Sequence, residues 1–198
     1  TKEDFDFDLG GRVVSLVPTQ LRRLLASEQA VLRLRASRLI LVGGGPMSQE
    51  LAQKARIENL PLSPTYGLTE TAGTVTFLPP ERFLAGEMSV GSVLPHLEVK
   101  LCPETKTLAI RGKSLCLGYY DSDFSPSAWF ETADLAKRNT DGAWRILGRT
   151  DRVVNTGGEK VDPTEVEAVI HQSGLADDCL VLGLPDPDWG ERLVAFCV

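Results

Sequence analysis

The strongest constraint on the fold is the alternation of short apolar runs and amphipathic stretches in the first part of the chain. Residues 12–17 and 38–42 are rich in branched apolar side chains, which is typical of buried β-strands. The first run is followed at once by Pro18, and proline is favoured in the first turn of a helix. The second run ends in a glycine turn, after which Ser48 can cap another helix. This order predicts an α/β layer built on a mostly parallel sheet.

The pattern changes from about residue 74 onward. Short runs with alternating apolar side chains, at residues 97–101 and 108–110, are separated by glycine and proline. The dipeptide Asp141-Gly142 then precedes another short strand, and this dipeptide favours a tight hairpin turn. These features predict an antiparallel β subdomain that adjoins the parallel layer.

A third segment begins near Asp151 and contains a clear helix signal. Asp162 can cap the helix and Pro163 can be its first residue, while Gly174 can end it. The apolar residues that this helix is expected to bury are Val166, Val169 and Ile170.

Two predicted strands follow this helix, at residues 179–184 and 191–198. Together they indicate the start of a small α+β domain, so the whole chain is expected to be of mixed α/β (α+β) class. A domain of about 48 residues would have a poor core, and its last strand continues to the final residue. We therefore expect that the chain is a piece of a longer protein.

The composition excludes several classes of function. The chain has 21 basic and 27 acidic residues and a formal net charge of −6, so nucleic acid is not an expected partner. Its longest apolar runs are about six residues, whereas a membrane span needs ~20. The four cysteines form no CxxC pair and lie in apolar, strand-like segments. They are expected to be buried, reduced thiols of a cytoplasmic protein. No feature of the sequence indicates an oligomeric state.

Two motifs follow predicted strands of the α/β layer. Gly43-Gly44-Gly45-Pro46 would let a flat ligand or a phosphate approach the backbone, although a tight strand-to-helix turn needs the same residues. Tyr66-Gly67-Leu68-Thr69-Glu70-Thr71 supplies a flat face for stacking, a hydroxyl for a phosphate oxygen and a carboxylate for Mg²⁺. A turn with a helix cap would account equally well for this second motif.

Two further motifs lie nearer the C-terminus. Asp134 can accept two hydrogen bonds from a ribose diol, and Arg149 can reach ribose or phosphate oxygens. The alternative is a surface Asp–Arg pair. The run Thr156-Gly157-Gly158-Glu159-Lys160 is not a Walker loop, because GxxxxGK[ST] is absent, and a simple glycine turn before a helix is its alternative.

In this order and spacing, the motifs resemble those of the adenylate-forming acyl-CoA synthetase superfamily. The resemblance extends over nearly the whole chain from about residue 12. The segments that carry it are YGLTETAG, WFETADL, LGRTDRVVNTGGEKVDPTEVEAVI and LVLGLPDPDWGERLVAF. The run SLVPTQLRRLL at residues 15–25 and the run LVGGGPMS narrow the resemblance to the o-succinylbenzoate–CoA ligases of menaquinone and phylloquinone biosynthesis.

The resemblance implies an ATP-dependent acid–thiol ligase that uses small-molecule partners. The carboxylate of o-succinylbenzoate would attack the α-phosphorus of ATP in the presence of Mg²⁺, giving an acyl-adenylate and pyrophosphate. The thiol of coenzyme A (CoA) would then displace AMP and give o-succinylbenzoyl-CoA. A small C-terminal domain would swing about a hinge between these steps, and the site would exclude water from the adenylate.

The resemblance also implies a role for each motif. Tyr66 would stack on adenine, Thr69 would hold phosphate and Glu70 would bind Mg²⁺, so Thr69 and Glu70 are the expected catalytic residues. Asp134 would accept from the ribose hydroxyls, and Arg149 would help to hold the nucleotide. The expected nucleotide-binding residues are Gly44, Gly45, Pro46, Tyr66, Thr69, Asp134 and Arg149.

Asp151 would be the hinge between two domains. Residues 1–150 would then be the C-terminal part of the large core domain, and residues 151–198 a partial lid domain. The residues expected to edge the CoA pantetheine tunnel are Gly157, Gly158 and Glu159.

The chain departs from the family pattern in three places. Thr132-Ala133-Asp134 stands where the family usually has Thr-Gly-Asp, a change that keeps the carboxylate. The family's phosphate loop would precede residue 1, and its adenylating lysine would follow Val198. We therefore expect that the 198-residue chain alone cannot form the adenylate.

Three other interpretations are compatible with parts of the sequence. One is another aryl- or fatty-acyl-CoA synthetase, and another is a non-catalytic nucleotide-binding fragment or assembly partner. A peptide-synthetase adenylation domain fits less well. Its hinge loop usually continues with a basic Arg-Gly-x-Arg-Ile-Glu pattern, whereas here Asp162 and Pro163 follow.

Overall fold

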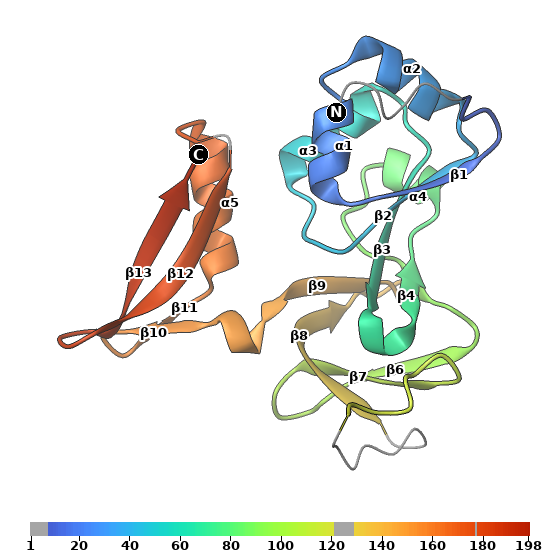
Figure 1. Cartoon of the computed structure of the whole chain (residues 1–198). Helices are drawn as coiled ribbons and strands as arrows, with labels where there is room; N and C mark the ends of the chain where they lie inside the picture. Colours follow the sequence, from blue (N-terminus) through green and yellow to red (C-terminus); the bar gives the residue numbers. More distant parts are fainter. Residues whose placement is uncertain (1–7, 121–128, 177) are drawn as a thin grey trace. The chain divides into compact units, whose positions relative to one another are not determined.

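The protein forms two compact units (Figure 1), seen in a computed structural model that describes residues 8–120, 129–176 and 178–198. The first unit comprises residues 1–100, 109–130 and 137–145, and the second comprises residues 101–108, 131–136 and 146–198. Helices and several sheets occur together, so the predicted mixed α/β class is confirmed.

The first unit contains a five-stranded sheet that is parallel at one side and antiparallel at the other. Strands β1 to β3 pair in parallel, whereas β3, β4 and β5 pair antiparallel. The predicted parallel layer therefore continues into an antiparallel region within one sheet. In sheet order, its strands are β1 (Val13–Leu16), β2 (Leu39–Val42), β3 (Leu62–Leu68), β4 (Gly73–Phe77) and β5 (Ser92–Val93).

Two helices of this unit, α1 and α3, begin where the sequence predicts. Helix α1 begins at Pro18, and the hydroxyl of Ser48 caps α3 by accepting from the backbone N–H of Leu51 at 3.2 Å. A serine cap also begins α2, where the side chain of Ser27 accepts from Ala30 N–H. The helices are α1 (Pro18–Leu24), α2 (Glu28–Ala36), α3 (Gln49–Ile57) and α4 (Pro80–Leu84), and a 3₁₀ turn, η1 (Thr69–Thr71), follows β3.

A second sheet contains four strands in sequence order: β6 (Leu97–Leu101), β7 (Thr107–Gly112), β8 (Phe130–Arg138) and β9 (Trp144–Arg149). The connections β6–β7 and β8–β9 are too short for a crossover, so these pairs are antiparallel. The β8–β9 connection contains the predicted Asp141-Gly142 turn. It is closed by a 2.7 Å hydrogen bond from Asn139 N–H to the carbonyl of Ala143, and Gly142 has φ +88°. The predicted hairpin is confirmed.

The C-terminal segment forms a small antiparallel sheet with one helix. Asp162 caps this helix through a 2.8 Å hydrogen bond from Thr164 N–H, and Gly174 ends it with φ +68°, as predicted. In Figure 1 the helix lies alongside the hairpin of the last two strands. The elements are η2 (Thr150–Arg152), β10 (Val154–Thr156), β11 (Glu159–Val161), α5 (Pro163–Ser173), β12 (Cys179–Asp186) and β13 (Gly190–Cys197), with sheet order β11-β10-β13-β12.

The predicted apolar face of α5 is partly wrong. Val166 and Ile170 are half-buried, but Val169 is 65% exposed. Glu167 faces β12, because its carboxylate accepts from the backbone N–H of Val181 at 2.9 Å. Each residue of an α-helix turns by ~100°, so Val169 lies about 200° further round the helix than Glu167. Its side chain therefore points away from β12.

The predicted burial of the cysteines is also wrong, although all four are free. Cys102, Cys116 and Cys179 are half-buried and Cys197 is exposed. Cys102 and Cys116 lie just outside strands, and the backbone of Cys102 closes the β6–β7 turn with Thr107. Cys102 directly follows the last residue of β6, and Cys116 lies in the irregular segment after β7, so the strands themselves do not carry these two thiols into the core. Within the described ranges, no helix has the length and apolarity needed to cross a lipid bilayer.

We expect that Leu62→Ala destabilises the protein by about 2–5 kcal/mol, because it removes a fully buried side chain from the central strand β3. Urea denaturation measures the free energy of unfolding. The matched control is Leu32→Ala on α2, where the side chain is 62% exposed, and it should change stability by less than about 0.5 kcal/mol. Equal losses for the two variants would contradict this core assignment.

Candidate functional site

The glycine motif lies at the carboxyl end of β2, beside the adjoining strand β3. The hydroxyl of Thr65 donates to the carbonyl of Val42 at 3.2 Å, and a Cβ atom on Gly43 would come within 2.5 Å of that hydroxyl oxygen. Gly44 has φ +77°, which glycine adopts readily. The turn therefore needs these two glycines. Gly44, Gly45 and Pro46 are exposed at the strand ends where α/β sheets bind ligands.

The second motif forms a rigid turn between β3 and β4. The pairing has a β-bulge between Tyr66 and Gly67, and a Cβ atom on Gly67 would overlap the backbone of Gly73. The hydroxyl of Thr71 accepts from Leu68 N–H at 3.0 Å and donates to the carbonyl of Gly73 at 2.7 Å. Thr71 is therefore a structural residue of this turn, and bulges of this kind are common beside active sites.

Thr69 and Glu70 are the side chains that this turn presents. Thr69 is exposed, and its hydroxyl makes no hydrogen bond within the described part of the chain. Glu70 is half-buried, and one of its carboxylate oxygens accepts from the hydroxyl of Tyr119 at 2.5 Å. Tyr66, by contrast, is only 9% exposed, so its ring has little free surface in this structure.

Tyr119 is a residue that the sequence did not predict at this site. Its hydrogen bond to Glu70, followed by partial desolvation, raises the pKa of Tyr119 to about 12. Forty-nine residues separate the two partners, and no spacing rule connects a turn to a residue so far along the chain. Only the fold brings them together.

In the second unit, Arg149 links two of the predicted residues. Its Nη1 donates to Asp134 at 2.9 Å, while Nε and Nη2 donate to the two oxygens of Asp151 at 2.9 and 2.6 Å. The side chain of Asp134 is only 6% exposed, and Arg149 places a compensating positive charge beside its carboxylate. The bond to Asp151, with the charges of both carboxylates, raises the pKa of Arg149, and Arg149 holds the pKa of Asp151 below its usual value.

The motif at residues 156–160 is a glycine turn between β10 and β11. The backbone N–H of Gly157 donates to the carbonyl of Trp189 at 2.9 Å, and a Cβ atom here would lie 2.6 Å from the Trp189 ring. Gly157 also has φ +59°, so glycine is required for two reasons. Gly158 and Glu159 are exposed at the tip of this turn.

Glu70 and Thr69 could bind Mg²⁺ only together with a phosphate that supplies further ligands to the ion. No group of three or more His, Cys, Asp or Glu side chains that could hold a metal occurs among the residues that the structure describes. Mg²⁺ is usually bound by one or two carboxylates together with substrate phosphates and water. Glu70 can supply one such carboxylate, and the exposed hydroxyl of Thr69 lies on the same turn.

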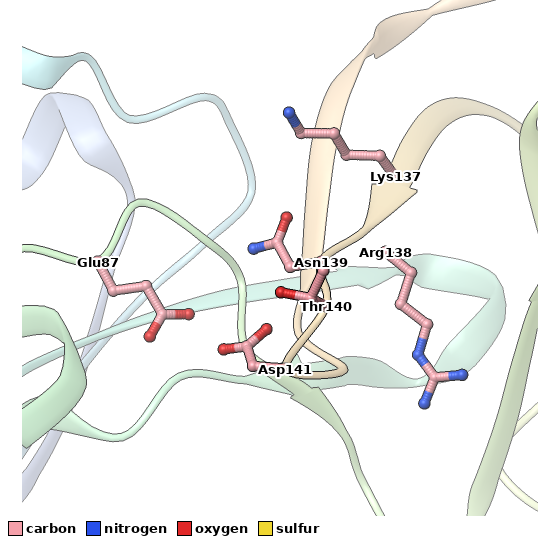
Figure 2. A pocket seen from close by; sticks show the side chains of 6 residues that line it. All are labelled: Glu87, Lys137, Arg138, Asn139, Thr140 and Asp141. Carbon is pink, nitrogen blue, oxygen red and sulfur yellow. The ribbon is translucent and has the colours of Figure 1, made fainter.

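A separate polar depression of about 640 Å³ lies over the β8–β9 turn. Figure 2 shows the carboxylates of Glu87 and Asp141 pointing toward each other across it. Arg82 forms ion pairs with both of these carboxylates, so each already has a cationic partner. The depression contains none of the predicted site residues. Its lining residues are Glu87, Lys137, Arg138, Asn139, Thr140 and Asp141.

The comparison with known families agrees with the motifs. Residues 8–120, more than half of the chain, match the model of the AMP-binding enzyme family. The chain therefore belongs to the AMP-binding enzyme family.

Several curated relatives of the chain are named 2-succinylbenzoate–CoA ligase. The chain is 33% identical over 190 residues to the 2-succinylbenzoate–CoA ligase of Listeria monocytogenes serotype 4b, covering 93% of this chain and 40% of the relative. It is 33% identical over 200 residues to the 2-succinylbenzoate–CoA ligase of Bacillus velezensis, covering 94% and 40%. The chain thus spans about 40% of the length of these relatives.

The chain also resembles solved structures of enzymes with the equivalent name, o-succinylbenzoate CoA synthetase or MenE. An E. coli MenE variant with bound OSB-AMS superposes with a TM-score of 0.79 at 32% identity, covering 96% of this chain and 41% of that one. The Bacillus subtilis o-succinylbenzoate CoA synthetase MenE, in complex with the acyl-adenylate intermediate OSB-AMP, has a TM-score of 0.78 at 27% identity, covering 93% and 40%. The same B. subtilis enzyme in complex with ATP and magnesium has a TM-score of 0.77 at 26% identity, again covering 93% of this chain, and 41% of that one.

The hydrogen bond between Tyr119 and Glu70 predicts an unusual titration. We expect the phenol of Tyr119 to ionise at a pKa of about 12, against 10.0 for an unperturbed tyrosine. Because the folded-state pKa is the higher one, this bond stabilises the fold fully below pH ~10 and is lost as the pH rises toward ~12. Near-ultraviolet phenolate absorbance measures the titration, and Tyr119→Phe identifies its signal.

The substitution Glu70→Gln should bring the pKa of Tyr119 back toward the ordinary value, because the neighbouring negative charge is removed. The same absorbance titration, run on this variant, measures the change. An identical Tyr119 midpoint in the parent protein and in the Glu70→Gln variant would show that the carboxylate does not perturb this phenol.

Proposed function

We propose that the protein is an AMP-forming acyl-CoA ligase that acts on o-succinylbenzoate. Its family, the names of the curated relatives and the order of its motifs support this proposal. The observation that carries it is the buried carboxylate of Asp134 held by Arg149, because a fixed and charged carboxylate suits recognition of a ribose diol.

The proposed reaction has two steps. The acid carboxylate attacks the α-phosphorus of ATP, giving an acyl-adenylate and pyrophosphate. The thiol of CoA then attacks the acyl carbonyl, and AMP leaves. Mg²⁺, when bound, would neutralise charge on the phosphates. The protein contributes mainly by positioning the reactants and excluding water, which are the principal needs of such transfers.

In the first unit, the proposed nucleotide residues lie on two turns. Gly44, Gly45 and Pro46 form an exposed backbone turn that a flat base or an acyl group could approach. On the second turn, Thr69 would hold phosphate and Glu70 would bind Mg²⁺. Tyr66 would stack on adenine with the small part of its ring that is exposed.

In the second unit, Asp134 would accept from the ribose hydroxyls and Arg149 would help to hold the nucleotide. Asp151, on η2, would be the hinge, with residues 1–150 belonging to a large core domain and residues 151–198 to a lid. The bidentate contact of Arg149 with Asp151 supports a link between nucleotide binding and hinge position. The exposed turn of Gly157, Gly158 and Glu159 would edge the CoA tunnel.

We also propose that the 198 residues alone do not form the adenylate, because the family's phosphate loop and adenylating lysine are not among them. A cytoplasmic location belongs to the same proposal. Four free cysteines fit a reducing compartment, and both ATP and CoA are abundant there.

A panel of carboxylic acids, assayed with ATP and CoA in the full-length protein, tests the function. We expect the highest kcat/KM for o-succinylbenzoate. Benzoates or long-chain acids that outcompete it would instead favour a general aryl- or fatty-acyl-CoA synthetase. Absence of both pyrophosphate release and ATP binding would favour a non-catalytic fragment.

Asp134→Asn tests the ribose contact. We expect the KM for ATP to rise by about 10- to 100-fold, because hydrogen bonds to charged groups contribute ~1.5–3 kcal/mol. The matched control is Asp141→Asn, an exposed aspartate of the β8–β9 turn outside the proposed site, which should leave the KM unchanged. Thermal unfolding shows whether each variant folds, and an unchanged KM in a folded Asp134→Asn protein would contradict the ribose assignment.

A further inference from the structure

Glu70 is anchored at two points by one distant segment of the chain. The backbone N–H of Cys116 donates to the carbonyl of Glu70 at 2.7 Å, and the hydroxyl of Tyr119 donates to its carboxylate at 2.5 Å. Both donors follow β7, three residues apart, while Glu70 lies on the turn between β3 and β4. The main chain and the side chain of Glu70 are therefore fixed by the same segment.

The Tyr119 bond restricts the carboxylate without using all of its capacity. The hydroxyl contacts one carboxylate oxygen, and within residues 8–120, 129–176 and 178–198 the other oxygen accepts no hydrogen bond. An ionised carboxylate has about four lone-pair sites on its two oxygens. One oxygen therefore remains available to a cation while the bond from Tyr119 persists.

The contact between Tyr119 and Glu70 is a single hydrogen bond. Tyr119 is 54% exposed, so its ring contributes little to the core, whereas a hydroxyl-to-carboxylate bond is among the stronger hydrogen bonds. Its neighbour Tyr120 is 96% exposed. Of these two adjacent tyrosines, Tyr119 is the one whose hydroxyl donates to Glu70.

We propose that Tyr119 is a positioning residue for Glu70, holding its carboxylate in the orientation in which the second oxygen binds the Mg²⁺ that accompanies ATP. This inference rests on the proposed function, in which Glu70 binds that ion. Tyr119 acts through Glu70 and does not contact the reacting atoms. Hydrogen-bond partners of metal-binding carboxylates commonly affect metal affinity by 10- to 100-fold, roughly, when removed.

The test uses Mn²⁺ as the probe, with ATP and the full-length protein but without an acid substrate, so that no adenylate forms. Electron paramagnetic resonance quantifies the unbound Mn²⁺. We expect Tyr119→Phe to weaken Mn²⁺ affinity by about tenfold, and the matched control Tyr120→Phe to leave it unchanged. In steady-state assays, Tyr119→Phe should raise the KM for Mg²⁺ but leave kcat at saturating Mg²⁺ unaltered.

The variant Glu70→Gln separates the possible failures. If Glu70→Gln weakens Mn²⁺ binding but Tyr119→Phe does not, the positioning role is overturned and the proposed function stands. If neither variant changes the affinity, the metal role of Glu70 fails and the inference fails with it. In the double variant, Tyr119→Phe should add nothing to Glu70→Gln, and a further tenfold loss would show that Tyr119 acts independently of Glu70.

Discussion

The central interaction of the second unit is the contact of one guanidinium with two carboxylates. Asp134 is almost completely buried, and a buried carboxylate is costly unless a partner compensates its charge. Arg149 supplies that charge from the end of β9 and uses its remaining N–H groups on Asp151. Through this one guanidinium, Asp151 on η2 is linked to Asp134 on β8. Lysine could not replace Arg149 here, because it lacks the planar fork that contacts two carboxylates at once.

In the first unit, glycines occupy positions where other parts of the chain approach too closely for a side chain. Gly43 lies against Thr65, and Gly67 lies against the backbone of Gly73. These approaches fix the turns on which the exposed glycine motif and the Thr69-Glu70 pair are presented. The glycines are thus explained by packing alone, so their presence in a motif is not by itself evidence of ligand binding. The functional argument depends instead on the polar side chains that these turns hold in place.

The features that sequence predicted well are those encoded by neighbouring residues. Ser48, Asp162 and Gly174 begin or end helices through contacts within a few residues, and the Asp141-Gly142 turn is equally local. The failures depend on tertiary packing. Whether Val169 or Cys197 is buried depends on which face of the helix or strand another element covers, and hydropathy along the chain does not contain that information. The proposed nucleotide-binding residues come from the family resemblance, since each motif alone also fitted a structural role.

Tyr119 shows what local patterns and family motifs both leave out. Its hydroxyl bonds to a motif residue from outside every motif, because the segment from Cys116 to Tyr119, after β7, lies against the turn that follows β3. Arg149 acts on Asp134 in a similar way, with the partners on different strands. In both cases a hydrogen-bond donor fixes a carboxylate before any ligand arrives. Electrostatic preorganisation of this kind reduces the reorganisation that ligand binding would require, and here it depends on contacts between segments that are distant in the sequence.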